Sequence, residues 1–570
     1  MKKLFTFMLT ALMLIASANV FADFTEGGVT YTVLGTMTVK ATGVTSSATD
    51  VTIPSKVQNG YYYVTSIASG FCTDNSKITG ITIDATYMSE IPVLCSNCAN
   101  LDYVSINGGN TNLIVNGGCI SDCPKLNAVR FPKAKLIYST AVTNCAKLTH
   151  VTFDDVSVIG HQVIYICPSV NYITWESDVK DLKCRNSSGN EVDVTNINST
   201  NPFANIRSQI TKIDLDGQYV PAHLFRNMTA LTELNMYSGL EEIGQYAFTG
   251  CTSLKNFYPY NATNLKVIHD YAFNYCAISN NLFLLQTNNP NLYHIGVHAF
   301  DGYQGKSITI QCGVSSNGGL TICGYAFANS PYLNDISLSG HINYIYESAF
   351  SSCPNIEKVS INTENVWTQS YSTSGGPFAH KSNLKTVKLS GYFRAPDYLF
   401  AGSGVETAEI KCQGGVEQNT FYNCQSLKTL TWDVTMPSSS FTFSPFDLSP
   451  ITTLTIGENV TELTKNLFKD ISSLKTITSN AVTPPTLGTD VFTGCNNGNL
   501  RGIALTVPAG SESQYMAAEG WCEFYGTCGG DEAVDEVQGD KVQCTKVIEN
   551  GQLYILRDGK VFNLQGAQVK

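Results

Sequence analysis

Nineteen cysteines are this chain's largest group of residues able to form disulfides, bind metals or exchange electrons. Cys95 and Cys98 have the spacing of a redox-active or zinc-binding pair. Nine cysteines, however, share one position of an internal repeat: Cys98, Cys123, Cys145, Cys167, Cys251, Cys276, Cys353, Cys424 and Cys495. Other units place Ile206 or Met228 at this position, and neither can form a disulfide. The position therefore predicts a small apolar niche that buries free thiols.

The sequence does not decide whether the remaining cysteines form disulfides. Stacked repeat neighbours lie within disulfide distance, but their side chains run parallel instead of converging. One or two bridges are compatible with the cysteines at irregular positions: Cys72, Cys119, Cys184, Cys312, Cys323, Cys412, Cys522, Cys528 and Cys544. Because the total is odd, at least one thiol has no partner within a monomer.

Two histidines, His294 and His298, have the spacing of a metal pair on a helix. The repeat instead predicts a turn-like segment, since Tyr344 and Ser348 take the same positions in a later unit. The sequence has no motif for phosphate binding, zinc proteolysis or a nucleophilic serine. We predict no catalytic residue, no metal and no cofactor. A hydrolase would need scattered carboxylates to converge in the fold.

Short alternating segments offer a surface for binding. Their outward position is mostly Ser or Thr, as in Ser105 and Thr431, and hydroxyls without a neighbouring base can hydrogen-bond but not attack. Residues that interrupt this series, or that add aromatic rings, are the predicted binding residues: Arg130, Asp214, Asn235, Tyr258, Tyr260 and Lys388. Tyrosine is favoured in contact surfaces because it combines a large area with a polar tip. The alternative is that tyrosine simply suits strands.

A repeated apolar pattern positions all of these residues. Its clearest form is Ile-x-x-x-Ala-Phe-x-x-Cys-x-x-Leu, followed by two further apolar residues, and residues 345–361 show it with Ile in the Leu position. Eighteen units are anchored at Phe71, Cys95, Ile120, Val142, Ile164, Phe203, Phe225, Phe248, Phe273, Phe300, Phe327, Phe350, Phe378, Phe400, Phe421, Phe446, Phe468 and Phe492. The alternating end of each unit predicts a short strand. Stacking of these strands predicts a parallel solenoid.

The pattern resembles the BspA-type leucine-rich-repeat proteins, a bacterial surface and secreted family. The Ala-Phe pairs such as Ala247-Phe248, the Cys three positions after the anchor and the closing Gly520-Trp521 carry this resemblance over residues 51–525. Three units depart from the pattern with Pro-Phe. The resemblance implies an α/β-type repeat solenoid dominated by short parallel β-strands, a leucine-rich-repeat superhelix with a β-hairpin N-cap and a short helical C-cap. It also implies adhesion.

Composition predicts further segments at both ends. Residues 1–22 resemble a secretory signal peptide, and residues 23–50 contain two alternating segments that predict a β cap. Residues 51–525 form the predicted solenoid, 526–546 an acidic linker and 547–570 a β-hairpin tail. The tail resembles the end of the sorting domains that direct bacterial proteins through the type IX route. The alternative is a purely structural tail.

The charge balance argues against some classes of binding partner. Thirty-five basic against 46 acidic residues give a net charge of −11, which argues against nucleic acid and anionic membranes. No segment predicts a transmembrane helix. We expect a secreted or outer-surface monomer without enzymatic activity, an adhesin or interaction scaffold that recognises host or neighbouring-cell macromolecules. The alternative is a glycan-binding accessory of a polysaccharide-uptake system.

Overall fold

The computed structural model describes residues 23–285, 287–313, 318–364, 371–373, 375–436, 440–528, 544–549, 552–557, 560–563 and 568–569. The predicted signal peptide and residues 529–543 of the predicted linker lie outside them. The described residues form two units. Unit 1 runs to Leu333 and includes Asn343–Cys353; unit 2 consists of Asn334–Ile342 and the chain from Pro354 onward.

The first sheet of unit 1 contains the predicted hairpin. Its strand order is β1 (Phe24–Glu26), β2 (Val29–Gly35), β3 (Thr38–Val44), β6 (Tyr62–Ile67) and β5 (Lys56–Val57). Strands β2 and β3 pair antiparallel, as the alternating sequence predicts. Val29 and Tyr31 alternate with more exposed residues and are fully buried. The sheet extends past the predicted boundary at residue 50, because β5 and β6 join it.

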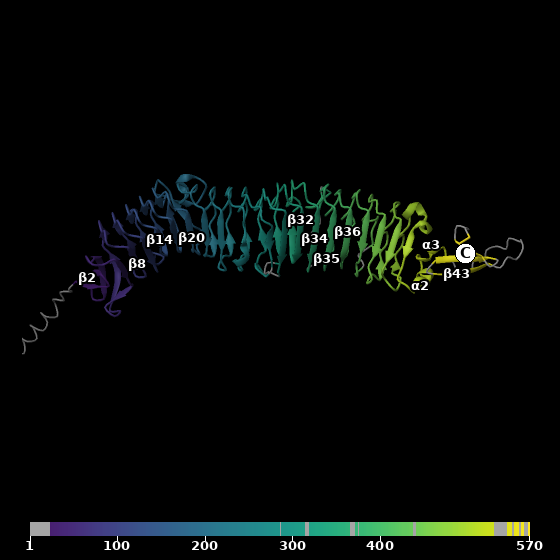
Figure 1. The fold of residues 1–570 in the computed structure, drawn as a ribbon, viewed down its shortest axis with the longest axis horizontal. Coiled ribbons are helices and arrows are strands. Elements are labelled where there is room, and N and C mark those ends of the chain that lie inside the picture. The colour runs from purple at the N-terminus through teal and green to yellow at the C-terminus, as the bar shows by residue number, and fades with distance from the viewer. Residues whose placement is uncertain are drawn as a thin grey trace, which may run out of the picture. The chain divides into compact units, whose positions relative to one another are not determined.

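Each repeat in the first part of unit 1 forms up to three short strands, which stack on those of neighbouring repeats (Figure 1). One sheet contains β4 (Asp50–Ile53), β8 (Gly80–Asp84), β11 (Tyr103–Asn107), β14 (Ala128–Phe131), β17 (His150–Phe153), β20 (Tyr172–Trp175), β23 (Lys212–Leu215) and β25 (Glu233–Met236). A second contains β7 (Cys72–Thr73), β10 (Cys95–Ser96), β13 (Ile120–Ser121), β16 (Val142–Thr143) and β19 (Ile164–Tyr165). A third contains β9 (Glu90–Ile91), β12 (Ile114–Val115), β15 (Ala134–Ile137), β18 (Val156–Gly160), β21 (Lys183–Arg185) and β22 (Glu191–Asp193).

The later repeats of unit 1 form fewer strands. A parallel sheet contains β24 (Tyr219–Val220), β26 (Glu242–Ile243), β27 (Val267–Ile268), β29 (His294–Ile295), β31 (Leu320–Ile322) and β33 (Ile342–Ile345), whose first residue belongs to unit 2. Strands β28 (Leu282–Leu284) and β30 (Ser307–Cys312) pair in parallel. Two short 3-10 helices are η1 (Asn198–Thr200) and η2 (Pro259–Asn261).

Unit 2 has the same architecture. Its main parallel sheet contains β32 (Asp335–Gly340), β34 (Lys358–Thr363), β35 (Thr386–Gly391), β36 (Thr407–Cys412), β37 (Thr429–Trp432), β38 (Thr453–Ile456), β40 (Thr476–Ser479) and β42 (Ala504–Thr506). Its remaining elements are β39 (Glu462–Leu463), β41 (Thr486–Leu487), η3 (Cys495–Gly498), η4 (Leu500–Gly502), α2 (Glu512–Ala517) and α3 (Cys522–Tyr525). The protein is thus a parallel-strand β-solenoid with little helix, as predicted.

Buried phenylalanines form the centre of both units. In unit 1 the anchors from Phe203 to Phe350 stack face to face with ring centroids 5.3 to 5.9 Å apart. In unit 2 the rings from Phe378 to Phe492 are 5.2 to 6.0 Å apart. The stacks follow from the sequence, because the same repeat position recurs once per turn. Earlier units instead bury Cys95, Ile120 and Val142 at this position.

The repeated cysteines are buried free thiols, as predicted, but they also donate hydrogen bonds. Cys276 Sγ donates to the Phe248 carbonyl oxygen at 3.1 Å, and Cys495 Sγ donates to the Phe468 carbonyl at 3.0 Å. In each pair the acceptor is the anchor of the preceding turn. Cys95 and Cys98 are likewise unbridged and fully buried. The niche therefore combines apolar packing with satisfaction of a backbone carbonyl.

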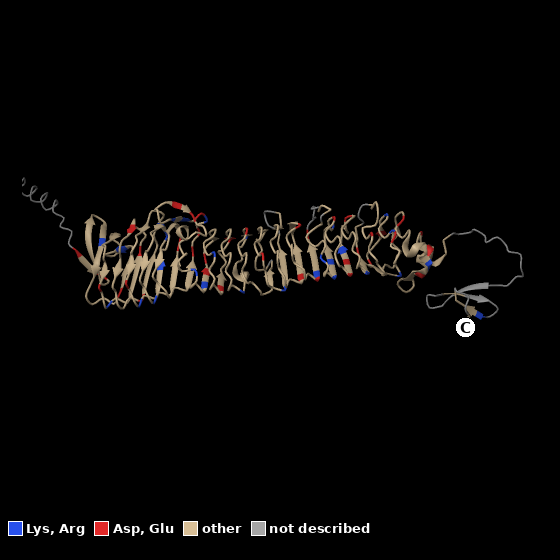
Figure 2. Ribbon diagram, turned by 90° about the horizontal axis from the view of Figure 1, so that it is seen from above, with Lys and Arg blue, Asp and Glu red and all other residues tan. Residues whose placement is uncertain are grey.

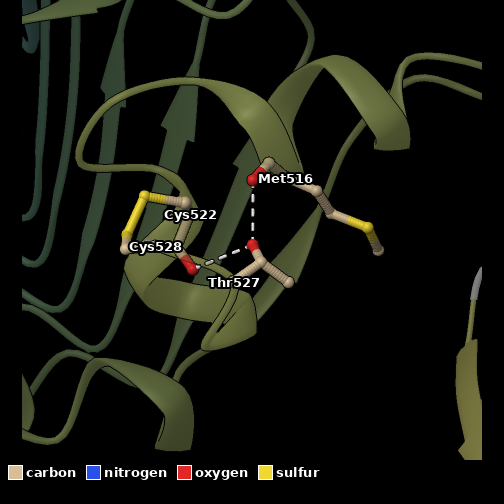
Figure 3. The surroundings of a disulfide bond; sticks show 4 residues. All are labelled: Met516, Cys522, Thr527 and Cys528. Carbon is tan, nitrogen blue, oxygen red and sulfur yellow. Dashed lines mark hydrogen bonds between the residues drawn. A yellow bond between two sulfur atoms is a disulfide. The ribbon is translucent and has the colours of Figure 1, made fainter. Parts of the chain in front are cut away.

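One disulfide occurs among the described cysteines, between Cys522 and Cys528, with the Cα atoms 4.9 Å apart (Figure 3). Thr527 Oγ1 donates to the Met516 carbonyl at 2.8 Å beside it. This bridge ties α3 to the chain that follows. Nearby, Trp521 is fully buried and its Nε1 donates to the Pro485 carbonyl at 2.7 Å.

The tail contains the antiparallel strands β43 (Cys544–Glu549), β44 (Gln552–Arg557) and β45 (Lys560–Phe562). Pairing of β44 with β45 agrees with the predicted hairpin, although its turn residues Asp558 and Gly559 lie outside the described residues. Among the residues that the structure describes, no helix has the length and apolar character needed to cross a bilayer.

Candidate functional site

Strand register places three of the predicted binding residues, Arg130, Asp214 and Asn235, in one row. Arg130 pairs with Thr152, which pairs with Thr174, and the row continues through Asp214 to Asn235. Because successive side chains of a strand point to opposite faces, the row lies on the face opposite to core residues such as Val129 and Ile213, although Thr152 and Asp214 are only 7% exposed. We call this surface, over β14, β17, β20, β23 and β25, the strand face.

The guanidinium of Arg130 is held by carboxylates from the next two turns. Its Nη1 donates to Glu176 Oε1 at 2.7 Å and its Nη2 to Glu176 Oε2 at 2.5 Å, a bidentate pair. Nη2 also donates to Asp154 Oδ2 at 3.3 Å. The hydrogen bond to Glu176 is the main cause that raises the pKa of Arg130. Arg130 therefore already has an intramolecular partner for its charge.

Asp214 is the centre of a second group on the strand face. Its carboxylate is buried and accepts from the Tyr172 hydroxyl and, at 2.8 Å, from Asn235 Nδ2. Lys212 Nζ lies 3.9 Å from Asp214 Oδ1 and 2.9 Å from Glu233 Oε1. Burial, followed by the hydrogen bond to Asp214, raises the pKa of Tyr172. Asp214 and Asn235 therefore bind to each other across neighbouring strands.

Other groups on the strand face are also paired. The His150 ring stacks on Tyr172 with centroids 3.8 Å apart, and its Nε2 lies 2.9 Å from Thr174 Oγ1. Burial lowers the pKa of His150. Burial, and then the nearby charges of Glu176 and Asp214, raise the pKa of Asp216. Figure 2 shows acidic and basic residues interspersed along the described strands.

Tyr258 and Tyr260 lie where the ladder of strands is interrupted. The amide of Asn280 replaces the missing strand partner: the Phe257 backbone N–H donates to Asn280 Oδ1 at 3.0 Å, and Asn280 Nδ2 donates to the Phe257 carbonyl at 3.1 Å. Pro259, which has no N–H to donate to a ladder, is buried between the two tyrosines in η2. The irregular backbone therefore has satisfied hydrogen bonds despite lacking a regular strand.

Both tyrosine rings remain accessible. Tyr258 is 47% exposed and Tyr260 is 39% exposed, and their ring centroids are 5.6 Å apart. The Tyr258 hydroxyl donates to Asn256 Oδ1 at 3.3 Å. The two rings thus present a fixed aromatic surface with polar tips, which we call the tyrosine pair.

Lys388 belongs to β35 of unit 2 and does not join the group around Arg130 and Asp214. Its Nζ lies 3.3 Å from Glu409 Oε2, and Glu409 Oε1 is 2.8 Å from Lys411 Nζ. The Lys388 side chain is 61% exposed, so this pair contributes little to stability.

The two histidines with metal-pair spacing have separate neighbours. His294 Nε2 lies 3.8 Å from Cys323 Sγ, whereas His298 Nδ1 lies 2.7 Å from Asp301 Oδ2. Within the described part of the chain, no three His, Cys, Asp or Glu side chains are grouped so that they could hold a metal ion.

Sequence reasoning missed a ladder of stacked rings along the turns. Neighbouring centroids are 4.6 to 4.8 Å apart. The members are His223, Tyr246, Tyr271, His298 and Tyr325, each with φ between 53 and 60°. Such angles are uncommon for bulky residues. A signal for the ladder was present, because each residue stands two positions before a phenylalanine anchor.

Sequence comparison supports the repeat assignment. The profile of the BspA type leucine rich repeat region (6 copies) matches residues 93–210, 195–319, 295–428 and 396–506, together more than half of the chain. No curated protein matches the sequence.

Solved structures to which the chain is similar share little sequence identity. A leucine-rich repeat protein from Bacteroides ovatus is 17% identical, over 84% of this chain and 93% of that chain, with a TM-score of 0.23. The pneumococcal vaccine antigen PcpA is 16% identical, over 65% of this chain and 93% of that chain, with a TM-score of 0.24. A leucine rich cell surface protein from Faecalibacterium prausnitzii is 15% identical, over 87% of this chain and 97% of that chain, with a TM-score of 0.20. On the match of the repeat profile, the chain belongs to the BspA type leucine-rich-repeat family.

Proposed function

We propose that this protein is an exported, non-enzymatic scaffold that binds an extracellular protein through the tyrosine pair, as an adhesin does. The observation that carries the proposal is the exposure of Tyr258 and Tyr260 at a break in an otherwise regular ladder. Rigid scaffolds commonly place binding residues on such irregular segments. Tyrosine is also enriched among the residues that contribute most to protein interfaces.

A binding role agrees with the chemistry of the strand face. The carboxylates of Glu176 and Asp214 already accept hydrogen bonds from Arg130, Tyr172 and Asn235. These contacts connect different turns of the solenoid, which agrees with a structural role for both carboxylates. We therefore assign a structural role in the strand face to Arg130, Asp214 and Asn235. The tyrosine pair is the surface that contacts the partner protein.

Export is part of the same proposal. Membership of a surface and secreted family, together with the predicted signal peptide, supports a secreted or outer-surface location. We retain the predicted domain boundaries, the role of residues 547–570 as a sorting signal, and a monomeric state as proposals. Removal of residues 547–570 should leave the protein inside the cell envelope if the tail is the sorting signal.

Glycan binding is the second candidate function. An exposed aromatic ring beside the Asn256 amide is the observation in its favour, because sugars stack on rings and hydrogen-bond to amides. The strand tryptophans do not contribute, since Trp175 is fully buried and Trp432 is 2% exposed. The same variants distinguish the two candidates.

The test compares the full-length protein with Tyr258→Ala/Tyr260→Ala on immobilised extracellular-matrix proteins and on a glycan array. Tyr332→Ala, which removes a 59% exposed tyrosine of the same unit, is the matched control. We expect binding to at least one protein, weakened about tenfold or more by the double variant only. Binding confined to glycans would favour the second candidate, and unchanged binding by the double variant would contradict the assigned surface.

A further inference from the structure

Two arginines of unit 1, Arg207 and Arg226, differ from Arg130 in their surroundings. No ion pair among the described residues includes either side chain, whereas Arg130 and Arg394 each contact a carboxylate. Both arginines are half-buried residues, and the Nε atom of each is buried without a hydrogen-bond acceptor among the described atoms. A buried donor of this kind normally has an acceptor, because a buried N–H group without a hydrogen bond destabilises the fold.

Asn196 connects the two arginines, because its Oδ1 accepts from Arg207 Nη1 at 3.4 Å and, at 2.9 Å, from Nδ2 of Asn227, the residue that follows Arg226. Burial, and then the charge of Arg226, lowers the pKa of Arg207. Like charges placed together are destabilising unless an anion compensates them. The pair therefore differs from other basic groups of the unit, such as Lys212 and Lys266, which lie beside carboxylates.

Neutral groups hold both arginines in place. Arg207 Nη1 lies 3.4 Å from Asn196 Oδ1, and Arg207 Nη2 lies 3.3 Å from the Asn196 carbonyl. Arg226 lies over the Tyr246 ring at 4.8 Å from its centroid, and its Nη1 is 3.4 Å from His223 Nδ1. These long contacts fix the direction of each guanidinium but leave its charge uncompensated.

The chain between Ile164 and Phe203 supplies one wall of this arrangement. This longer step between two anchors contains β21, β22 and η1, and Asn196 lies between β22 and η1. Asn227 Nδ2 donates to Asn196 Oδ1 at 2.9 Å and so connects this insertion to the repeat that carries Arg226. The position of Asn196 is therefore fixed by the solenoid itself.

We propose that Arg207 and Arg226 form a binding site for a dianionic oxyanion group, a sulfate or a phosphate. Two guanidinium forks suit such a group because each can donate two hydrogen bonds to its oxygens. The net charge of −11 disfavours a long polyanion, so the site fits a single charged group on a ligand. This site is separate from the tyrosine pair and does not depend on the partner proposed for it.

Isothermal titration of the full-length protein with sodium sulfate, and separately with sodium phosphate, tests the proposal at constant ionic strength set with chloride. We expect saturable binding with a Kd on the order of 1 mM. Arg207→Gln/Arg226→Gln should weaken it at least tenfold. The control Lys147→Gln/Lys255→Gln removes the same charge from two exposed lysines, for which no ion pair is seen in the described structure, and should bind as the unaltered protein does.

Folding is controlled by circular dichroism and by the single variant Arg226→Gln, which should also lose binding. Sulfate stabilises proteins generally by exclusion from their surface, so a rise in Tm alone is not the readout. Equal heats for the unaltered protein and the double arginine variant would overturn the proposal. Retention of binding by Tyr258→Ala/Tyr260→Ala would support it as a second, independent site. If one anion binds and the other does not, that result identifies the group.

Discussion

The strand face and the arginine pair, Arg207 with Arg226, belong to the same unit, but the groups that surround their positive charges differ. On the strand face, Arg130 meets a carboxylate from each of the next two turns. At the arginine pair, Arg207 and Arg226 meet amides, an imidazole and an aromatic ring. An unusual charged residue in a repeat can thus either form an intramolecular ion pair or remain available to bind a ligand. Only the neighbouring residues in the fold distinguish these two roles.

The difference has an energetic meaning. A charge-assisted, bidentate bond such as that of Arg130 to Glu176 stabilises the fold and leaves little for a ligand. Two guanidinium groups without carboxylate partners lower the stability of the free protein. An anion that binds the folded state would raise that stability again. The strand face should therefore lose stability when altered, and the arginine pair should lose binding.

The largest expected effect on stability is at Asp214. Asp214→Ala leaves the Tyr172 hydroxyl, the Asn235 amide and Lys212 without their shared acceptor. We expect the free energy of unfolding to fall by about 2–3 kcal/mol, since unmade buried hydrogen bonds are costly. Chemical denaturation followed by circular dichroism measures it, and a loss within experimental error would show that the strand face is not a connected network.

A smaller effect is expected at Arg130. Arg130→Gln leaves Glu176 and Asp154 facing each other without a cation, at a cost of about 1–2 kcal/mol. The same substitution at Arg226 should not lower stability, and should raise it by up to about 0.5 kcal/mol, because no carboxylate loses a partner and the repulsion with Arg207 is removed. Equal losses at the two sites, measured by denaturation in a buffer without sulfate or phosphate, would remove the distinction between them.

The smallest effect concerns two histidines. Burial, and then Arg226, lowers the pKa of His223, and burial lowers the pKa of His150. Each folded pKa is below the unfolded value, so the unfolded state binds protons first, and stability falls as the pH drops below about 6.5. NMR titration should show both pKa values below that value. Sulfate should raise the pKa of His223 only, because it would neutralise Arg226; equal shifts at His150 would indicate a general salt effect.

The regular features of the fold follow from the sequence because they recur at a fixed position. The Phe248 anchor, the Cys251 niche and the strand after them are each read from residue types that return once per turn. Stacking of turns then places every anchor above the previous one. The sequence therefore predicts the solenoid, the buried thiols and the outer row that contains Arg130 and Asp214.

The partners of that row were not predicted, although they were within reach. Asp154 and Glu176 follow Arg130 by 24 and 46 residues, two positions past its equivalent in the next two turns. The arginine pair was harder to foresee, because Asn196 lies in an insertion that follows no repeat. The break at Tyr258 was missed for a similar reason, since a single amide, that of Asn280, takes the place of a strand.

The contrast between the two regions can be seen directly in a crystal. Crystals grown without sulfate or phosphate and soaked in sodium selenate would reveal a bound oxyanion by its anomalous signal. We expect a peak between the guanidinium groups of Arg207 and Arg226, with none beside Arg130. A peak beside Arg130 that displaces Glu176, or an empty arginine pair in soaked crystals, would contradict this expectation.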